Sequence, residues 1–170
     1  MNEVAQWVNF YPITSQAAAV LIGLLFVCIS FAADRSLKDT ATIRIYLTPT
    51  IIYFVSVFFL AAVLLFPYHT KITVTIYLCL SGVVGLIYAG AFLIHRNTKK
   101  DYKERHDRIP YAGLPFIAYG LIELGGIMFA YYPKFGLLSV AASMLSLLAI
   151  AIRNSWAIAI YLISTPKNKY

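Results

Sequence analysis

Apolar residues run through this chain in five long stretches, with short polar segments between them. A helix needs about 20 apolar residues to cross the hydrocarbon core of a bilayer, and each stretch reaches that length. The pattern predicts an all-α fold: a polytopic membrane helical bundle with five transmembrane helices, in one membrane domain. The predicted spans, within the single domain 1–170, are residues 13–33, 46–66, 72–94, 112–131 and 135–163.

The fifth apolar run is too long for one upright crossing at about 1.5 Å per helical residue. Arg153 and Asn154 interrupt it. We therefore expect a span from Phe135 to about Ile152, followed by a shallow or tilted end.

Composition favours lipid as the solvent. Hydrophobic residues make up 61% of the chain and charged residues 12%, whereas a soluble domain is about half apolar and a quarter charged. The net charge of +7 does not predict a nucleic-acid partner. The basic residues gather between the apolar runs, and no aromatic and basic motif of an RNA-binding fold is present.

The basic residues predict an orientation. With five crossings, one side of the membrane receives the first loop, the loop 95–110 and the C-terminal tail, with three, six and two Lys or Arg. The other side receives only Lys71 and Lys134. Cytoplasmic loops are enriched in Lys and Arg, so we expect the N-terminus outside and the C-terminus in the cytoplasm. No basic residue precedes the first run, so a signal peptide is not expected.

Glu123 is an acidic residue near the middle of an apolar span. A charge at that depth costs about 2.5–3.5 kcal/mol on insertion scales, so the carboxylate must be paired, protonated or hydrated. Gly120 and Gly126 leave space beside it on a helix, and Tyr119 can donate a hydrogen bond. Two interpretations remain open: an ion or proton site, and a structural hydrogen bond between helices or subunits.

Arg153 is the candidate partner of this carboxylate. Residue counting places it near the cytoplasmic boundary, about 10 Å in depth from Glu123. A long Arg side chain also reaches the interface by snorkelling. Snorkelling or capping of helix carbonyls is favoured over a buried ion pair.

Small residues predict close helix packing, because they let helix backbones approach each other. Ser81, Gly85 and Ala89 recur every four residues. Smooth faces of this kind also favour a homo-oligomer. The predicted packing residues are Gly23, Ser81, Gly85, Ala89, Gly120 and Gly126.

The loop 95–110 is the largest polar segment and carries a basic cluster. Each cation near a membrane surface contributes about 1 kcal/mol of attraction to anionic lipids. The cluster predicts binding of anionic headgroups or of a partner protein, although its role in orientation explains it as well. The candidate headgroup ligands are Arg96, Lys99, Lys100 and Lys103.

Few signs of catalysis are present. The sequence has no nucleotide-binding, nucleophile-elbow or zinc-protease motif, and its histidines are isolated, so no metal and no cofactor are expected. Cys28 and Cys79 lie about 12 Å apart in predicted depth, beyond the Cα separation of about 7 Å that a disulfide allows. An enzyme is not favoured.

Two segments resemble a group of small bacterial membrane proteins. The first span, A-A-A-V-L-I-G-L-L-F-V-C-I-S from Ala17 to Ser30, is similar to their opening span, and I-R-N-S-W from Ile152 to Trp156 is similar to their closing R-N-A/S-W. Ala157 stands where they often have an acidic residue. The resemblance implies a multi-pass protein of the bacterial inner membrane and no particular activity.

The leading functional hypothesis is an oligomeric channel or transporter that moves a small ion past Glu123. The alternative is a structural or accessory membrane subunit that binds a protein partner or anionic lipid through the basic loop.

Overall fold

The computed structural model describes residues 7–33, 40–67, 70–98 and 108–164, and the regular structure in these ranges is entirely helical. Each of its five helices contains a stretch that is long and apolar enough to cross a membrane. The five helices that the sequence predicts are therefore confirmed. They are α2 (Phe10–Ala33), α3 (Thr40–Leu65), α4 (Lys71–Thr98), α5 (Arg108–Tyr131) and α6 (Pro133–Ser164).

The last helix runs past the polar residues of the fifth apolar run. α6 has 32 residues and continues through Arg153 and Asn154 without a break, so these residues interrupt the apolar run but not the helix. Both residues keep their backbone N–H, and only proline among the common residues lacks that donor. Arg153 is exposed and Asn154 is buried. At about 1.5 Å per residue the helix is about 48 Å long, which exceeds a hydrocarbon core of about 30 Å and calls for tilt or projection beyond it.

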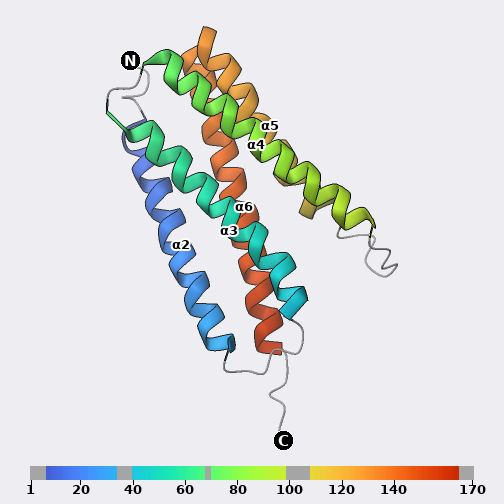
Figure 1. Ribbon diagram of the computed structural model, residues 1–170. Coiled ribbons are helices and arrows are strands. Elements are labelled where there is room, and N and C mark those ends of the chain that lie inside the picture. Colours follow the sequence, from blue (N-terminus) through green and yellow to red (C-terminus); the bar gives the residue numbers. More distant parts are fainter. Residues whose placement is uncertain (1–6, 34–39, 68–69, 99–107, 165–170) are drawn as a thin grey trace, which may run out of the picture.

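The helices form two groups that share α6. On one side α6 packs against α3, which in turn carries α2, and on the other side α6 packs against α5, which carries α4. Figure 1 shows α4 and α5 as a long pair that runs toward the lower right of the view, away from the lower half of α6. Helices α3 and α4 touch each other only slightly, so they diverge over the surface of α5 and α6.

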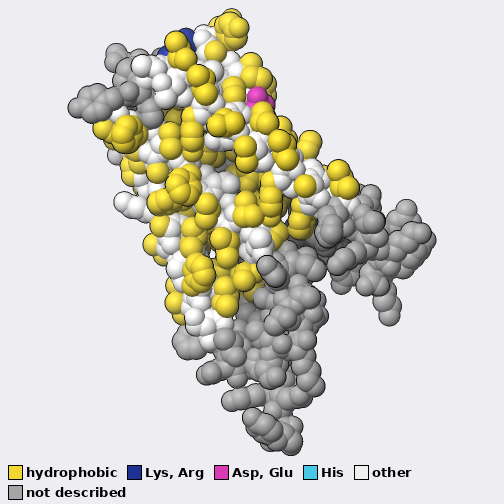
Figure 2. Space-filling model, viewed as in Figure 1, with side chains coloured by type: hydrophobic (Ala, Val, Ile, Leu, Met, Phe, Trp, Pro, Cys, Tyr) yellow, Lys and Arg dark blue, Asp and Glu magenta, His cyan; other side chains and the backbone are white. Residues whose placement is uncertain are grey.

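The outer surface is apolar. Large hydrophobic side chains are exposed on all five helices, among them Val20, Phe59, Ile87, Ile117 and Leu138. Figure 2 shows that hydrophobic side chains dominate the visible face of the described part. A monomeric soluble protein rarely exposes large contiguous apolar patches, so this surface is typical of a membrane protein.

The buried residues of α3 follow helical spacing. Tyr53, Val57, Leu60 and Leu64 are at most 3% exposed and recur at intervals of four, three and four residues, which places them on one face. Phe54, next to Tyr53, is also buried. α3 packs on both α2 and α6, so this face forms the core of the first helix group.

Two serines join α5 and α6. The hydroxyl of Ser143 donates to the carbonyl oxygen of Ala118 at 2.6 Å, and that of Ser139 donates to the carbonyl oxygen of Leu121 at 2.8 Å. Ser143 is fully buried. Interhelical hydrogen bonds in membranes contribute on average about 0.6 kcal/mol, so these bonds fix the register of the two helices more than they add stability.

Replacing Ser143 by Ala should lower the free energy of unfolding by about 0.6 kcal/mol and by no more than about 1.7 kcal/mol. The substitution removes one interhelical bond and leaves almost the same volume. Unfolding by SDS titration in detergent micelles measures the loss. Ser146→Ala is the control, because the hydroxyl of Ser146 donates to Ala142 within its own helix. Equal losses in the two variants would contradict a role of Ser143 in joining the helices.

Candidate functional site

Glu123 lies at a close contact between α4 and α5. It is one residue from the centre of the apolar stretch Gly113–Tyr131, so it is at mid-depth in its span. A Cβ atom built on Gly82 would lie 2.6 Å from its Oε2, 2.7 Å from its backbone nitrogen and 2.8 Å from its Cα. Only a glycine fits opposite this carboxylate. Oε2 is buried and has no hydrogen-bond partner among the described residues.

The half-buried side chain of Glu123 lies between the α4 contact and an outward-facing strip of α5. Residues 116, 120, 123 and 127 recur at intervals of four, three and four, so they share one face of the helix. Phe116 and Ile127 are 44% and 50% exposed, and a Cβ on Gly120 would meet nothing within 4 Å. One oxygen of the carboxylate therefore lies against α4, while Phe116 and Ile127 on the same helix face outward. Between them, the missing side chain of Gly120 leaves an open notch on the surface of α5.

The hydrogen-bond partner of Tyr119 is Ser56, whereas its position in the sequence indicated Glu123. Its hydroxyl lies 2.9 Å from the hydroxyl oxygen of Ser56 on α3, and its ring lies against Gly85 of α4, where even a Cβ atom would overlap it. Tyr119 is only 2% exposed. It links α5 to α3, so its hydrogen bond goes to Ser56 and not to Glu123.

Arg153 is farther from Glu123 than residue counting indicates. Gly125 and Gly136 lie opposite each other, since a Cβ on Gly136 would be 2.7 Å from the Gly125 oxygen, and this register places Leu138 level with Glu123. Arg153 is fifteen residues beyond Leu138, which is about 22 Å along α6. This separation is about twice the sequence-based value and exceeds the combined reach of the two side chains.

The predicted packing residues fall into two groups. Gly85 and Gly126 meet the neighbouring helix directly: a Cβ on Gly126 would lie 2.9 Å from both the nitrogen and the Sγ of Cys79. Ala89 is buried on the same stripe of α4. At Gly23 and Gly120, by contrast, a Cβ would meet nothing within 4 Å, so no other helix packs closely there among the described residues.

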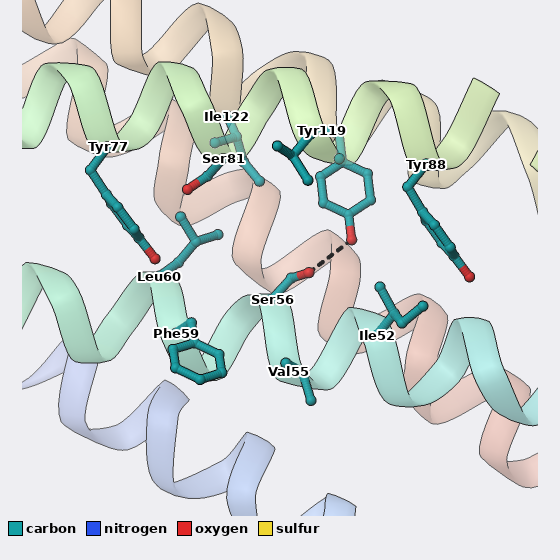
Figure 3. Close-up of a pocket in the computed structure, with 12 residues that line it drawn as sticks. Ile52, Val55, Ser56, Phe59, Leu60, Tyr77, Ser81, Tyr88, Tyr119 and Ile122 are labelled. Atoms are coloured by element: carbon teal, nitrogen blue, oxygen red, sulfur yellow. Dashed lines mark hydrogen bonds between the residues drawn. The ribbon is translucent and has the colours of Figure 1, made fainter. Parts of the chain in front are cut away.

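A pocket of about 290 Å³ lies where α3 and α4 diverge. Figure 3 shows the rings of Tyr77 and Tyr88 extending from α4 toward α3 at its two ends, with Tyr119 between them and hydrogen-bonded to Ser56. Among the residues that line the pocket, none is charged. They are Ile52, Val55, Ser56, Phe59, Leu60, Tyr77, Ser81, Val84, Gly85, Tyr88, Tyr119 and Ile122.

Sequence reasoning missed this pocket as a site, although Ser81, Gly85 and Tyr119 were singled out for other roles. Ser56, Tyr77 and Tyr88 carried a usable signal, because hydroxyl side chains inside apolar spans tend to face protein. The missing information was how α3, α4 and α5 pack, since all three helices contribute to the lining of the pocket.

Part of the predicted basic cluster lies outside the described residues. Lys99, Lys100 and Lys103 fall there, and for Arg96 the structure describes only the backbone, within α4. In the described part of the chain, no three His, Cys, Asp or Glu residues gather in a way that would hold a metal ion. Cys28 and Cys79 are free thiols.

These features define the class of the protein. Five apolar helices around a shared core, with an apolar outer surface, describe an α-helical multi-pass membrane protein. Beyond this class, the chain matches no protein-family model, no curated protein and no solved structure.

Proposed function

We propose that this protein is a membrane transport protein that moves a proton or a small cation, with Glu123 as the carboxylate that binds it. The observation that carries the proposal is the position of Glu123: at mid-depth in an apolar helix, with one oxygen buried against Gly82 and without a hydrogen-bond partner among the described residues. Ionisable groups at this depth are costly to insert and mark ion or proton pathways.

The outward strip of α5 supports an oligomeric form of the transporter. A pathway at Glu123 needs a polar surrounding, and the strip of residues 116, 120 and 127 next to it faces outward on one chain. A second copy packed at the open notch of Gly120 would enclose the carboxylate, since small residues permit close helix contact in lipid. In this arrangement the carboxylates of neighbouring copies line a shared path.

The basic loop orients the transporter. In this proposal the transporter lies in a bacterial inner membrane, with its N-terminus outside and its C-terminus in the cytoplasm. The loops and tail predicted on the cytoplasmic side hold eleven of the 14 Lys and Arg residues. The surrounding bilayer is the first partner, and anionic headgroups near the loop 95–110 are the second.

Ion flux into proteoliposomes tests the proposal. Protons and monovalent cations are followed with the purified wild type, Glu123→Gln and Tyr119→Phe. Glutamine keeps the shape of the side chain but cannot ionise, so we expect flux to fall to the level of protein-free vesicles. Tyr119→Phe is the matched control: it removes one hydroxyl in the adjacent turn of the same helix, on the side that faces Ser56, and should retain flux.

Two results would overturn the transport proposal. One is full flux in Glu123→Gln, which would remove the carboxylate from the pathway. The other is no flux by intact wild-type protein over a range of cations and pH values, which would favour an accessory subunit that acts through the basic loop.

A further inference from the structure

The pocket between α3 and α4 is independent of the transport pathway proposed at Glu123. Glu123 does not line it. On α4, Ser81 and Gly85 border the pocket, whereas Gly82 lies against the carboxylate.

The chemistry of the lining restricts what the pocket can hold. Its walls are aliphatic and aromatic, and its polar groups are hydroxyls, with no charged residue among them. A charged ligand would be left uncompensated there, which is costly in an apolar surrounding. The hydroxyls offer hydrogen bonds to a neutral oxygen. Ser56 is at the centre of the apolar stretch Leu47–Leu65, and Ser81 is close to the centre of Lys71–Ile94, so both lie near mid-depth in their spans.

The pocket also opens toward lipid. Phe59 and Val84 line it and are 56% and 57% exposed, and they come from α3 and α4, which scarcely touch each other. A ligand dissolved in the bilayer can therefore enter sideways between these helices. A lipid headgroup would not follow it, because mid-depth in the membrane is the most expensive place for a charged group.

Size and shape favour a single ring over a whole lipid. The volume of about 290 Å³ is at the lower end of small-molecule sites, which span about 300–1,000 Å³. Phe59, Tyr77 and Tyr119 supply aromatic faces on which a flat ring can stack.

We propose that this pocket binds a neutral, membrane-dissolved ring compound that carries a carbonyl or hydroxyl oxygen, of the quinone or phenol class. The ring occupies the space between Phe59 and the tyrosines of α4. Its oxygen takes part in the hydrogen bonding of Ser56 and Tyr119, or bonds to Ser81. Any remaining apolar part of the bound ligand extends out of the pocket through the opening between α3 and α4.

Fluorescence quenching by a short-chain alkylated benzoquinone tests the proposal in the full-length protein. Trp7 and Trp156 are first replaced by Phe, and Phe59→Trp then serves as the reporter in the pocket. Phe26→Trp is the control reporter, because Phe26 is 55% exposed on α2, remote from the pocket. We expect saturable quenching at position 59 and linear, unsaturated quenching at position 26.

Two substitutions then probe the hydroxyls. Adding Ser56→Ala or Tyr119→Phe to the Phe59→Trp reporter should raise the quinone concentration at half-saturation by about three- to tenfold, which corresponds to the loss of one hydrogen bond. A phenol should compete for the site, and a straight-chain alkane should not. Linear quenching at position 59, equal competition by the alkane, or unchanged half-saturation in both hydroxyl variants would each overturn the proposal.

Discussion

Replacing Gly136 by Ala should lower the free energy of unfolding by about 1–3 kcal/mol, the usual cost of extra volume in a packed core. A Cβ at this position would lie 2.6 Å from the backbone nitrogen of Phe129 and 2.7 Å from the carbonyl oxygen of Gly125. Backbone atoms of a helix cannot move aside as a side-chain tip can. The substitution therefore has to separate α5 from α6, and with them the bonds of Ser139 and Ser143.

Gly23→Ala provides the matched control. A Cβ there would meet nothing within 4 Å, so only the helix propensity changes, and alanine is better than glycine in a helix by about 0.5–1 kcal/mol. SDS titration in detergent micelles measures both variants. The two substitutions should thus act in opposite directions. A stable Gly136→Ala protein would mean that α5 and α6 do not approach as closely as the structure has them.

The sequence predicted the helices well, because their signal is local. Five runs of about 20 apolar residues are enough to predict five spans, and the basic gaps between them mark where each span ends. At Arg153 the polar pair marks an interruption of the apolar run, but the helix of 32 residues continues through it. A charged residue ends an apolar run without ending a helix, because its backbone still makes the helical hydrogen bonds.

Which faces of the helices meet was much harder to predict. A helix in water shows its buried face by the contrast between apolar and polar residues, but a helix in lipid is apolar all round. Only small or polar residues then mark a contact. On α4 the predicted stripe of Ser81, Gly85 and Ala89 lies close to the observed contact, yet Gly82, which fits against Glu123, was not assigned to it.

The candidate site shows the same limit. Glu123 could be found from the sequence because one carboxylate stands out in an apolar helix. The residues around Glu123 could not be found in this way. They depend on which residues of α4 lie level with which residues of α5, and the length of the segment between the two helices does not set this register. Ser56 and Tyr119 are 63 residues apart, and no spacing rule connects them. The pocket that they border was therefore beyond reach of the sequence.

Two neighbouring glycines of α4 offer a way to separate the two proposed sites. A Cβ on Gly82 would press on Oε2, the nitrogen and the Cα of Glu123, whereas a Cβ on Gly85 would overlap the ring of Tyr119. Both alanine substitutions should lower the free energy of unfolding by about 1–3 kcal/mol. Gly90→Ala is the control on the same helix, because a Cβ there would meet nothing within 4 Å.

The functional effects of the two substitutions should differ because each displaces a different side chain. Gly82→Ala should reduce ion flux, since the carboxylate of Glu123 loses its position, and should leave quinone binding nearly intact. Gly85→Ala should weaken quinone binding, since the ring of Tyr119 must move away from Ser56, and should leave flux nearly intact. Stability, flux and quenching are measured on the same preparations. If both variants lost both activities in proportion to their loss of stability, the sites would not be independent, and the α4–α5 contact would act as a single structural unit.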